Sequence, residues 1–176
     1  ANASGLMQAS WRFVLIPYLE SRTPSISVDH AWDDPVNREA LAFGDLYYAN
    51  PIPGDARTQD YGSIVAVTGP GTAFDAPELR RLAELPDDLI VLAEVAPLPA
   101  HWATPGDLKV LDVPASIARG PTGDGMHIVF ADSSVWWLDA DVPVDVLQCF
   151  LVIEGSRQYD REELLGKYGR AILPDE

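Results

Sequence analysis

The sequence has 176 residues, of which 12 are Lys or Arg and 27 are Asp or Glu, so its formal charge at pH 7 is −15. This charge repels nucleic-acid phosphates and anionic lipid surfaces, so we expect neither as a partner; cations, neutral glycans and basic proteins remain. Hydrophobic residues make up 47% of the chain and charged residues only 22%. Such a composition argues against disorder and predicts a single globular domain over residues 1–176.

The single cysteine and the lack of a long apolar run limit what can be said of the cellular setting. Cys149 cannot form an intramolecular disulfide, so it does not identify an oxidising compartment. It lies on an apolar helical stripe, and we expect a buried structural thiol. The sequence contains no run of about 18 apolar residues, and we expect this domain itself to make no membrane contact.

The first predicted element is a short buried helix between residues 10 and 20. Pro17 lacks the N–H that would bond to the carbonyl of Phe13, so we expect a kink, or a helix that starts late enough to hold the ring in its first turn. Apolar residues recur there with helical spacing, and Phe13 and Ile16 widen the stripe that they form. The residues of this stripe are Trp11, Val14, Leu15, Tyr18 and Leu19.

A second helix is predicted from a capping signal. Asp34 is a suitable N-cap, and Pro35 suits the first helical position because its missing N–H would have no helical partner there. Gly44 is expected to end this helix, and residues 46–49 then predict a short strand. The apolar side of the helix comprises Val36, Ala40 and Phe43.

The middle of the chain alternates between extended and turn-forming segments. Residues 61–68 are rich in β-branched side chains and predict a strand, which the glycines at 69 and 71 end. Pro77 begins a predicted helix over 77–85. The strongly apolar run 89–95 predicts a central strand.

The segment 96–121 is rich in Pro, Ala and Gly, and we expect it to wrap the surface. Within it we expect one short strand near 108–111 and a turn of helix at 114–118. Two helices are predicted nearer the C-terminus, over 144–151 and 161–168.

A hairpin is predicted where residues 126–131 and 135–138 flank Asp132, Ser133 and Ser134. Because Ser133 tolerates a positive φ poorly, we expect a loop of three or more residues or a locally costly conformation. The larger alternating set is expected on the buried face of the sheet. This set is Met126, Ile128 and Phe130.

The order of these elements predicts the fold class. Strands that follow one another without regular intervening helices favour an antiparallel sheet over a doubly wound parallel one. The expectation is therefore an α+β fold with an antiparallel sheet and helices packed on one side.

Several motifs resemble a known family. In chain order they are GPGTAF, HWATPGDL and the hairpin sequence FADSS, within segments that span nearly the whole chain. This order resembles a planctomycete-type family of exported proteins with a prepilin-like N-terminus, whose conserved domain is of unknown function and is also labelled solute-binding-protein-like. The family has a His and an Asp-Gly where this chain has Thr122 and Asp132-Ser133, and a Cys-Pro where it has Asn50-Pro51. No site or disulfide is carried over from those positions.

The resemblance implies a pilin- or pseudopilin-like headpiece. It implies an upstream prepilin-type apolar helix, outside the printed sequence, that anchors the full-length protein in a membrane or assembles it with other copies. It also implies an extracytoplasmic location, in the periplasm or at the cell surface.

Three residues are candidates for ligand binding. His101 and Trp102 are adjacent in an expected loop, where contact with a ligand is conceivable. Trp136 and Trp137 are adjacent in a strand and must face opposite ways, so Trp137 could stack on a sugar or a partner side chain while the other joins the core. Packing of these residues within the core and its edge is the alternative, and the one we favour.

An acidic segment is the candidate metal site. Asp29, Asp33 and Asp34 lie close together beside His30, and oxygen-rich loops suit Ca²⁺, which takes about six to eight oxygen ligands. The spacing is not that of an EF-hand. We favour the alternative that Asp34 caps a helix and the others are solvated, and we expect no cofactor.

Sequence motifs for catalysis are incomplete. Neither serine-containing turn has a Gly-x-Ser-x-Gly elbow, and TGPGT lacks the Lys-Ser/Thr that a phosphate loop requires. We therefore expect a non-enzymatic structural or interaction domain with protein partners or self-assembly. The alternative is a solute- or glycan-binding module, and paired carboxylates acting as in a glycosidase come third.

Overall fold

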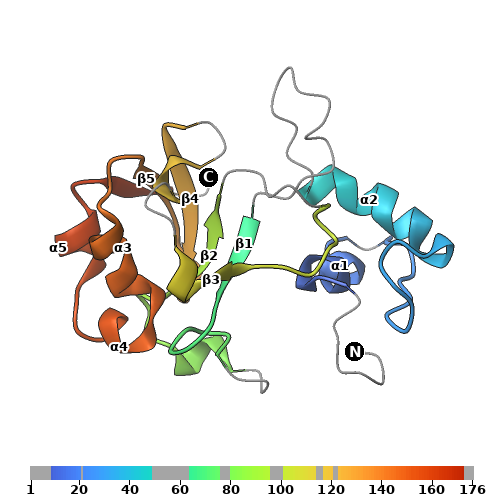
Figure 1. Ribbon diagram of the computed structural model, residues 1–176, viewed down its shortest axis with the longest axis horizontal. Coiled ribbons are helices and arrows are strands. Elements are labelled where there is room, and N and C mark those ends of the chain that lie inside the picture. The colour runs from blue at the N-terminus through green and yellow to red at the C-terminus, as the bar shows by residue number, and fades with distance from the viewer. Residues whose placement is uncertain are drawn as a thin grey trace. The chain divides into compact units, whose positions relative to one another are not determined.

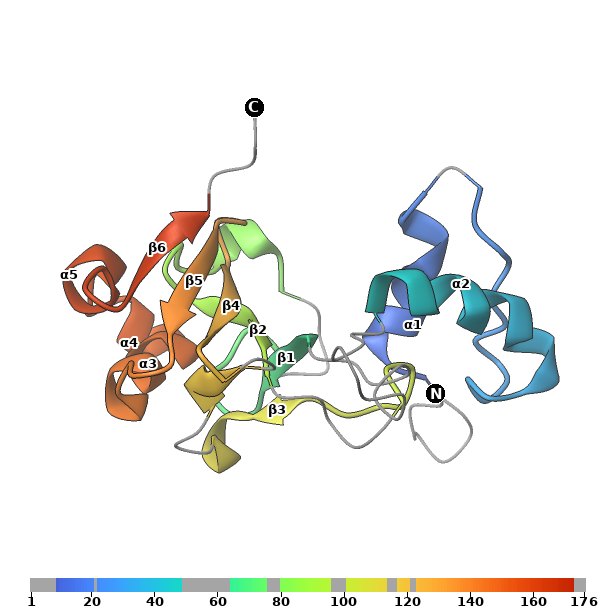
Figure 2. The same cartoon turned by 90° about the horizontal axis from the view of Figure 1, so that it is seen from above.

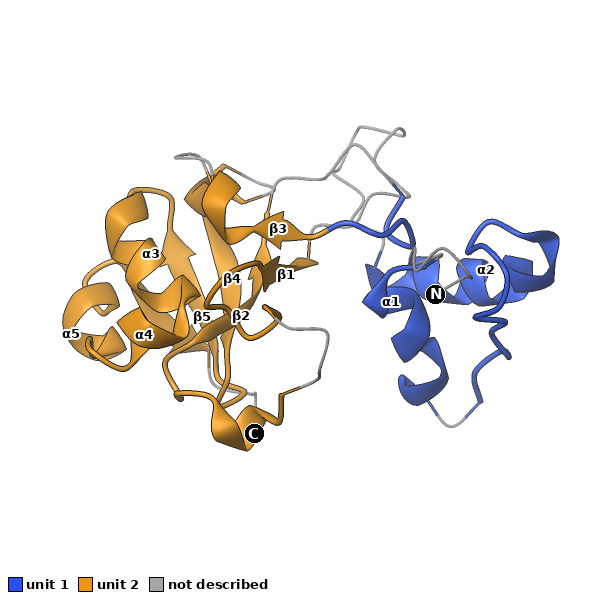
Figure 3. Ribbon diagram, turned by 60° about the horizontal axis from the view of Figure 1, so that its bottom comes forward, with its two compact units in different colours: residues 1–63, 97–106 blue, residues 64–96, 107–176 orange. Residues whose placement is uncertain are grey.

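The computed structural model describes residues 9–20, 22–48, 64–75, 80–95, 101–113, 117–120 and 123–172. The backbone groups into two compact units, shown in different colours in Figure 3. Unit 1 comprises residues 1–63 and 97–106, and unit 2 comprises 64–96 and 107–176. Each is described by itself, and the expectation of one domain over the whole chain stays a prediction.

Unit 1 begins with the short helix α1, Trp11–Leu15. The Ser10 hydroxyl accepts a hydrogen bond from the N–H of Phe13 and donates one to the carbonyl of Trp102, so it caps the helix and ties it to a distant loop. A 3₁₀-helix, Ile16–Tyr18, follows with Pro17 in its first turn. The predicted break at Pro17 is confirmed.

The predicted buried face of this segment is correct only for Phe13 and Ile16. Phe13 and Ile16 are fully buried, whereas Val14, Leu15 and Tyr18 are exposed. The prediction carried the 3.6-residue period through the whole segment, but the α-helix ends after five residues and a 3₁₀-helix has three residues per turn. This change of period explains the exposure of Tyr18, whereas Val14 and Leu15 lie within the α-helix, on the side opposite the buried Phe13.

The second helical segment consists of a 3₁₀-helix, Pro35–Asn37, and α2, Arg38–Tyr48. Asp34 is its N-cap and accepts a hydrogen bond from the N–H of Val36 at 3.0 Å, which confirms the capping prediction. Two other predictions are wrong: Gly44 does not end the helix, and 46–48 are helical rather than a strand. Gly44 lies against Trp102, and a Cβ at this position would overlap that ring. The glycine therefore permits close packing.

The hydrophobic cluster of unit 1 brings α1 and α2 together with the loop at residues 101–106. Trp102 and Ala103 are buried in it, so the prediction that 96–121 wraps the surface is wrong for these two residues. Asn37 is also buried, and its amide bonds to the backbone of Ser27 and Ala31. The buried apolar members of the cluster are Ala9, Phe13, Ile16, Ala40, Trp102 and Ala103.

Unit 2 is built on a six-stranded sheet with the order β3-β1-β2-β4-β5-β6 (Figures 1 and 2). All neighbouring strands are antiparallel except the pair β1 and β3, which is parallel. The predicted α+β class with a largely antiparallel sheet is confirmed, as is the internal position of β2. The strands are β1 Ile64–Thr68, β2 Ile90–Glu94, β3 Leu108–Lys109, β4 Gly125–Phe130, β5 Val135–Asp139 and β6 Gly169–Ile172.

One face of this sheet is covered by helices (Figure 2). Met126, Ile128 and Phe130 are buried on this face, as predicted. They belong to one hydrophobic cluster with Leu147, Phe150, Leu151 and Leu165 from the helices. The helices are α3 Val144–Leu151, α4 Ile153–Ser156 and α5 Arg161–Leu165.

The hairpin between β4 and β5 has the predicted loop of three residues. The N–H of Ser133 bonds to the carbonyl of Phe130, and the N–H of Phe130 bonds to the carbonyl of Ser134, both at 3.0 Å. Ser133 has φ +71°, which is the conformation that glycine usually supplies at this position of a three-residue hairpin loop. The conformational cost expected for this loop therefore falls on Ser133.

Several shorter elements differ from prediction. Residues 82–84 form a 3₁₀-helix rather than part of an α-helix, and 76–79 lie outside the described residues. Two more 3₁₀-helices, Val110–Asp112 and Ile117–Arg119, follow β3. The last helix ends at Leu165 and is followed by β6, which the sequence did not predict. The described helices include none with the length and apolar character needed to cross a membrane.

Candidate functional site

The second face of the sheet in unit 2 lies opposite the helices, and we call it the open face. Alternation along the strands places Leu92, Val129 and Val135 on it, all half-buried. Ile64, near the edge of the sheet, is 38% exposed on this face. The open face also carries Ala66, Glu94, His127, Trp137, Arg170 and Ile172.

A pocket of about 210 Å³ lies on the open face. Strands β1, β2, β4 and β5 each contribute to its lining, so it depends on the register of four strands rather than on one loop. Its lining is aliphatic except for one carboxylate and one imidazole. The lining residues are Ile64, Leu92, Ala93, Glu94, His127, Val129 and Val135.

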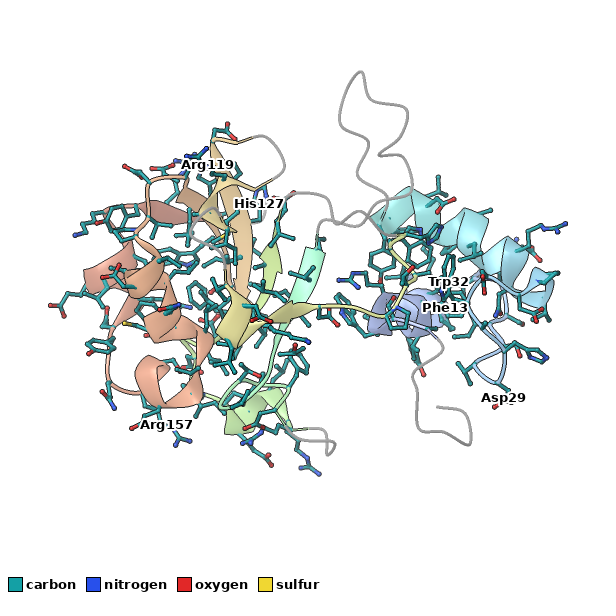
Figure 4. All side chains as sticks on the ribbon, viewed as in Figure 1. Phe13, Asp29, Trp32, Arg119, His127 and Arg157 are labelled. Carbon is teal, nitrogen blue, oxygen red and sulfur yellow. The ribbon has the colours of Figure 1, made fainter. Side chains whose placement is uncertain are left out.

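Glu94 and His127 form a paired carboxylate and imidazole in this pocket. Glu94 Oε2 lies 2.6 Å from His127 Nδ1 and accepts a second hydrogen bond from the backbone N–H of His127 at 3.2 Å. Because the carboxylate accepts a hydrogen bond from Nδ1, this nitrogen carries a proton, and Nε2 is the ring nitrogen not used in the contact. The His127 side chain is 46% exposed and the Glu94 side chain 19%. His127 lies on the sheet away from α3 and α5 in Figure 4.

The sequence does not identify Glu94 as the partner of His127. Glu94 lies 33 residues away in sequence and on a different strand. Only the pairing of β2 with β4 brings the two side chains together.

Trp137 lies beside this pair on β5. Its ring centroid is 4.8 Å from that of His127, in a T-shaped arrangement, and its Nε1 donates to Asp139 Oδ1 at 3.2 Å. The indole occupies the space above Gly125, where a Cβ would overlap the ring. Trp136 is buried and Trp137 is half-buried, so the predicted division of this pair between core and surface is confirmed.

The candidates His101 and Trp102 belong to unit 1, whereas Trp137 belongs to unit 2. Trp102 is 2% exposed, stacks with Phe13 and donates its Nε1 proton to Asp45 at 2.6 Å. It is a core residue with almost no surface for a ligand. His101 stacks between Trp102 and Trp32, with centroid distances of 5.3 Å and 4.5 Å. Its Nδ1 accepts the N–H of Ala103, which places the proton of the neutral ring on Nε2.

The acidic candidates for Ca²⁺ also lie in unit 1. Asp34 serves as the cap of the 3₁₀-helix, whereas Asp29 and Asp33 are exposed. His30 Nδ1 lies 2.8 Å from the Ser27 hydroxyl. Over the part of the chain that the structure describes, no three His, Cys, Asp or Glu side chains converge as metal ligands would. The Ca²⁺ site stays a prediction.

A charged network that the sequence did not reveal lies at the end of the hairpin. The Arg161 guanidinium contacts Asp132 at 2.6 Å, Ser134 at 2.9 Å and Asp88 at 3.2 Å. It also lies over the Phe130 ring, 4.7 Å from the centroid. The network joins the turn before β2, which contains Asp88, and the hairpin loop, which contains Asp132, to the start of α5.

The network has a clear electrostatic consequence. Burial by itself raises the pKa of Asp132, but hydrogen bonds from Arg161 and Ser134 outweigh it and lower the pKa to about 2. Burial likewise lowers the pKa of Arg161, while the hydrogen bond and charge of Asp132 outweigh it and raise the pKa. The network is therefore a structural connection in which every charge has a partner.

The chain matches no family model, no curated protein and no solved structure. The candidate site must therefore be interpreted from its own geometry, which combines an aliphatic pocket, a braced carboxylate and a half-buried indole. Each group can contact a ligand: the pocket can hold apolar atoms, the carboxylate can accept hydrogen bonds, and the indole has a surface for stacking.

Proposed function

We propose that this chain is a non-enzymatic interaction domain that binds a segment of a protein partner on the open face of unit 2. The observation that carries the proposal is the pocket of about 210 Å³ on that face. Pockets that enclose small-molecule ligands usually measure about 300–1,000 Å³. A smaller, mainly aliphatic pocket on a half-buried sheet face suits a single apolar side chain presented by a larger partner.

The proposal includes the cellular setting that the sequence motifs imply. The domain would be the extracytoplasmic headpiece of a pilin-like protein, in the periplasm or at the cell surface, anchored by an upstream apolar helix in the full-length protein. Support comes from the ordered motifs GPGTAF, HWATPGDL and FADSS. Self-assembly through that helix would leave the open face for a second partner.

A solute- or glycan-binding module is the second candidate, and Trp137 favours it. Its indole lies close to Gly125 and is contacted by a carboxylate, Asp139, and an imidazole, His127. Aromatic rings flanked by hydrogen-bonding groups are suited to stacking on sugars. In this case the ligand would lie on the indole, and the pocket would be secondary.

Site-specific photo-crosslinking separates the two candidates. A photoreactive amino acid at Ile64, in the pocket, would be compared with one at Leu111, which is 81% exposed and outside the pocket. In cells that express the full-length protein, we expect a discrete protein adduct from position 64 alone. Its partner, once identified and purified, should bind the unmodified domain. Saturable binding of a glycan that Trp137→Ala abolishes, without such an adduct, would support the second candidate instead.

A further inference from the structure

We infer that the segment bound on the open face carries a cation next to its apolar anchor, and that Glu94 is the carboxylate that recognises this cation. The inference rests on the proposed function and specifies the chemistry of the partner. The pocket beside Glu94 holds the apolar anchor of the partner. The cation would therefore be a Lys or Arg side chain next to that anchor.

The hydrogen bonds of Glu94 favour this role. Both donors that the described residues direct at its carboxylate, the ring and the backbone N–H of His127, end on Oε2. Oε1 is the second oxygen of a side chain that lines the pocket and is 19% exposed. A carboxylate held through one oxygen and open to a ligand through the other is pre-organised for a charge-assisted hydrogen bond.

His127 acts here as a positioning residue. Its ring is held by Glu94 on one side and by Trp137, at 4.8 Å between centroids, on the other. These contacts restrict the rotamer of Glu94 before a partner arrives, which reduces the entropy lost on binding.

The charges around the pocket agree with a cationic ligand. The other basic residues of the sheet are Lys109 on β3 and Arg170 on β6. Arg170 lies three strands from Glu94 in the sheet order, or roughly 14 Å at about 4.8 Å per strand. Arg170 shares the open face, and Trp137 lies between it and His127 in the cross-strand pairing. Lys109 lies two strands from Glu94 in the opposite direction along the sheet order. It pairs with Thr68, which is at the other end of β1 from Ile64. The formal charge of −15 also attracts a basic partner at longer range.

Three small probes with the same apolar body test the inference. Isoamylamine, isoamyl alcohol and isovalerate share a branched four-carbon group and differ in charge at pH 7.5. Each would be titrated to tens of millimolar in 150 mM NaCl while the amide signals of Leu92, Val129 and Val135 are followed by NMR. The alcohol reports on the apolar pocket, and the ratio of amine to alcohol affinity reports on Glu94.

We expect the amine to bind about three- to tenfold more tightly than the alcohol, and isovalerate to bind most weakly. Glu94→Gln should reduce the ratio of amine to alcohol affinity to about one while leaving alcohol binding in place, which also shows that the pocket is still folded. Glu154→Gln, the same charge change on exposed α4, should leave the ratio unchanged. Equal binding of amine and alcohol to the wild type would overturn the inference alone. Failure of all three probes to shift these amides would count against the pocket and hence the proposed function.

Discussion

Arg161→Met should destabilise unit 2 by about 1.5–3 kcal/mol at pH 7, because it removes the cation that both Asp88 and Asp132 contact. The fall in the pKa of Asp132 from 3.8 to about 2 corresponds to at most about 2.5 kcal/mol, since one pKa unit is worth about 1.36 kcal/mol. Ser134 supplies part of this shift and remains in the variant, and the Asp132 side chain is 24% exposed to screening solvent, so the share lost with Arg161 is about 1–2 kcal/mol. Loss of the contact between Arg161 and the Phe130 ring adds roughly 0.5–1 kcal/mol.

The pH dependence of this effect follows from the direction of the pKa shift. The folded-state pKa of Asp132 is depressed, so its contribution is fully present above the unfolded value near 3.8 and is lost as pH falls through about 2. The difference between wild type and Arg161→Met should therefore be constant from pH 7 to pH 5 and shrink below pH 4. Urea unfolding at each pH, monitored by tryptophan fluorescence, measures this difference.

A matched control is available in Arg157, which projects from the end of α4 (Figure 4). Arg157→Met removes the same charge from an exposed site and should change the unfolding free energy by less than about 0.5 kcal/mol. The reasoning would be refuted by an Arg161→Met effect as small as this, or by one that does not decrease in acid.

Three substitutions test the packing of the two units, and a chelator tests their dependence on metal. Phe130→Ala should lower the unfolding free energy by about 3–5 kcal/mol, because it leaves a cavity under β4. Ser133→Gly should be neutral or stabilising by up to about 1 kcal/mol, because φ at this position is +71°. Urea unfolding in which Ser133→Gly is the more destabilising of the two would contradict both assignments. Gly44→Ala should destabilise unit 1 by about 1–2 kcal/mol, since overlap with Trp102 outweighs the gain in helix propensity, and an increase in thermal stability would refute this. A chelator should leave the melting temperature unchanged, whereas a large fall would indicate a structural metal.

The strands and the hairpin of unit 2 could be predicted because their signals are local. Alternation of Met126, Ile128 and Phe130 with smaller or polar residues identified the buried face, and Ser133 identified an unfavourable turn position. Strand β6 was missed because GRAI is short and three of its four residues are exposed, so it carries no alternating pattern. It is defined only by pairing with β5.

The errors in unit 1 have a tertiary origin. Gly44 reads as a helix end in isolation, but a buried indole from a loop 58 positions later requires a glycine within the helix. Trp102 itself reads as a loop residue, and its burial depends on α1 and α2 packing around it. Neither the need for a glycine at position 44 nor the burial of Trp102 can be inferred from local composition.

The candidate site was only partly predictable for the same reason. Trp137 was identified from its position next to Trp136, since neighbours in a strand face opposite ways. The pair of Glu94 and His127 has no sequence spacing that would identify it, because the two residues meet through strand register. The contacts of Arg161 with Asp88 and Asp132 likewise join three distant segments.

The central claim is that the pocket on the open face binds a protein partner. The most direct test uses the partner that photo-crosslinking identifies, purified without the crosslink. Calorimetry would measure its affinity for the wild type, for Ile64→Asp and for Leu111→Asp. Ile64 lines the pocket, whereas Leu111 is a more exposed apolar residue outside it. We predict that Ile64→Asp weakens binding at least about tenfold with little change in the unfolding free energy, and that Leu111→Asp binds as the wild type does. Equal affinity of the Ile64→Asp variant and the wild type would contradict the claim.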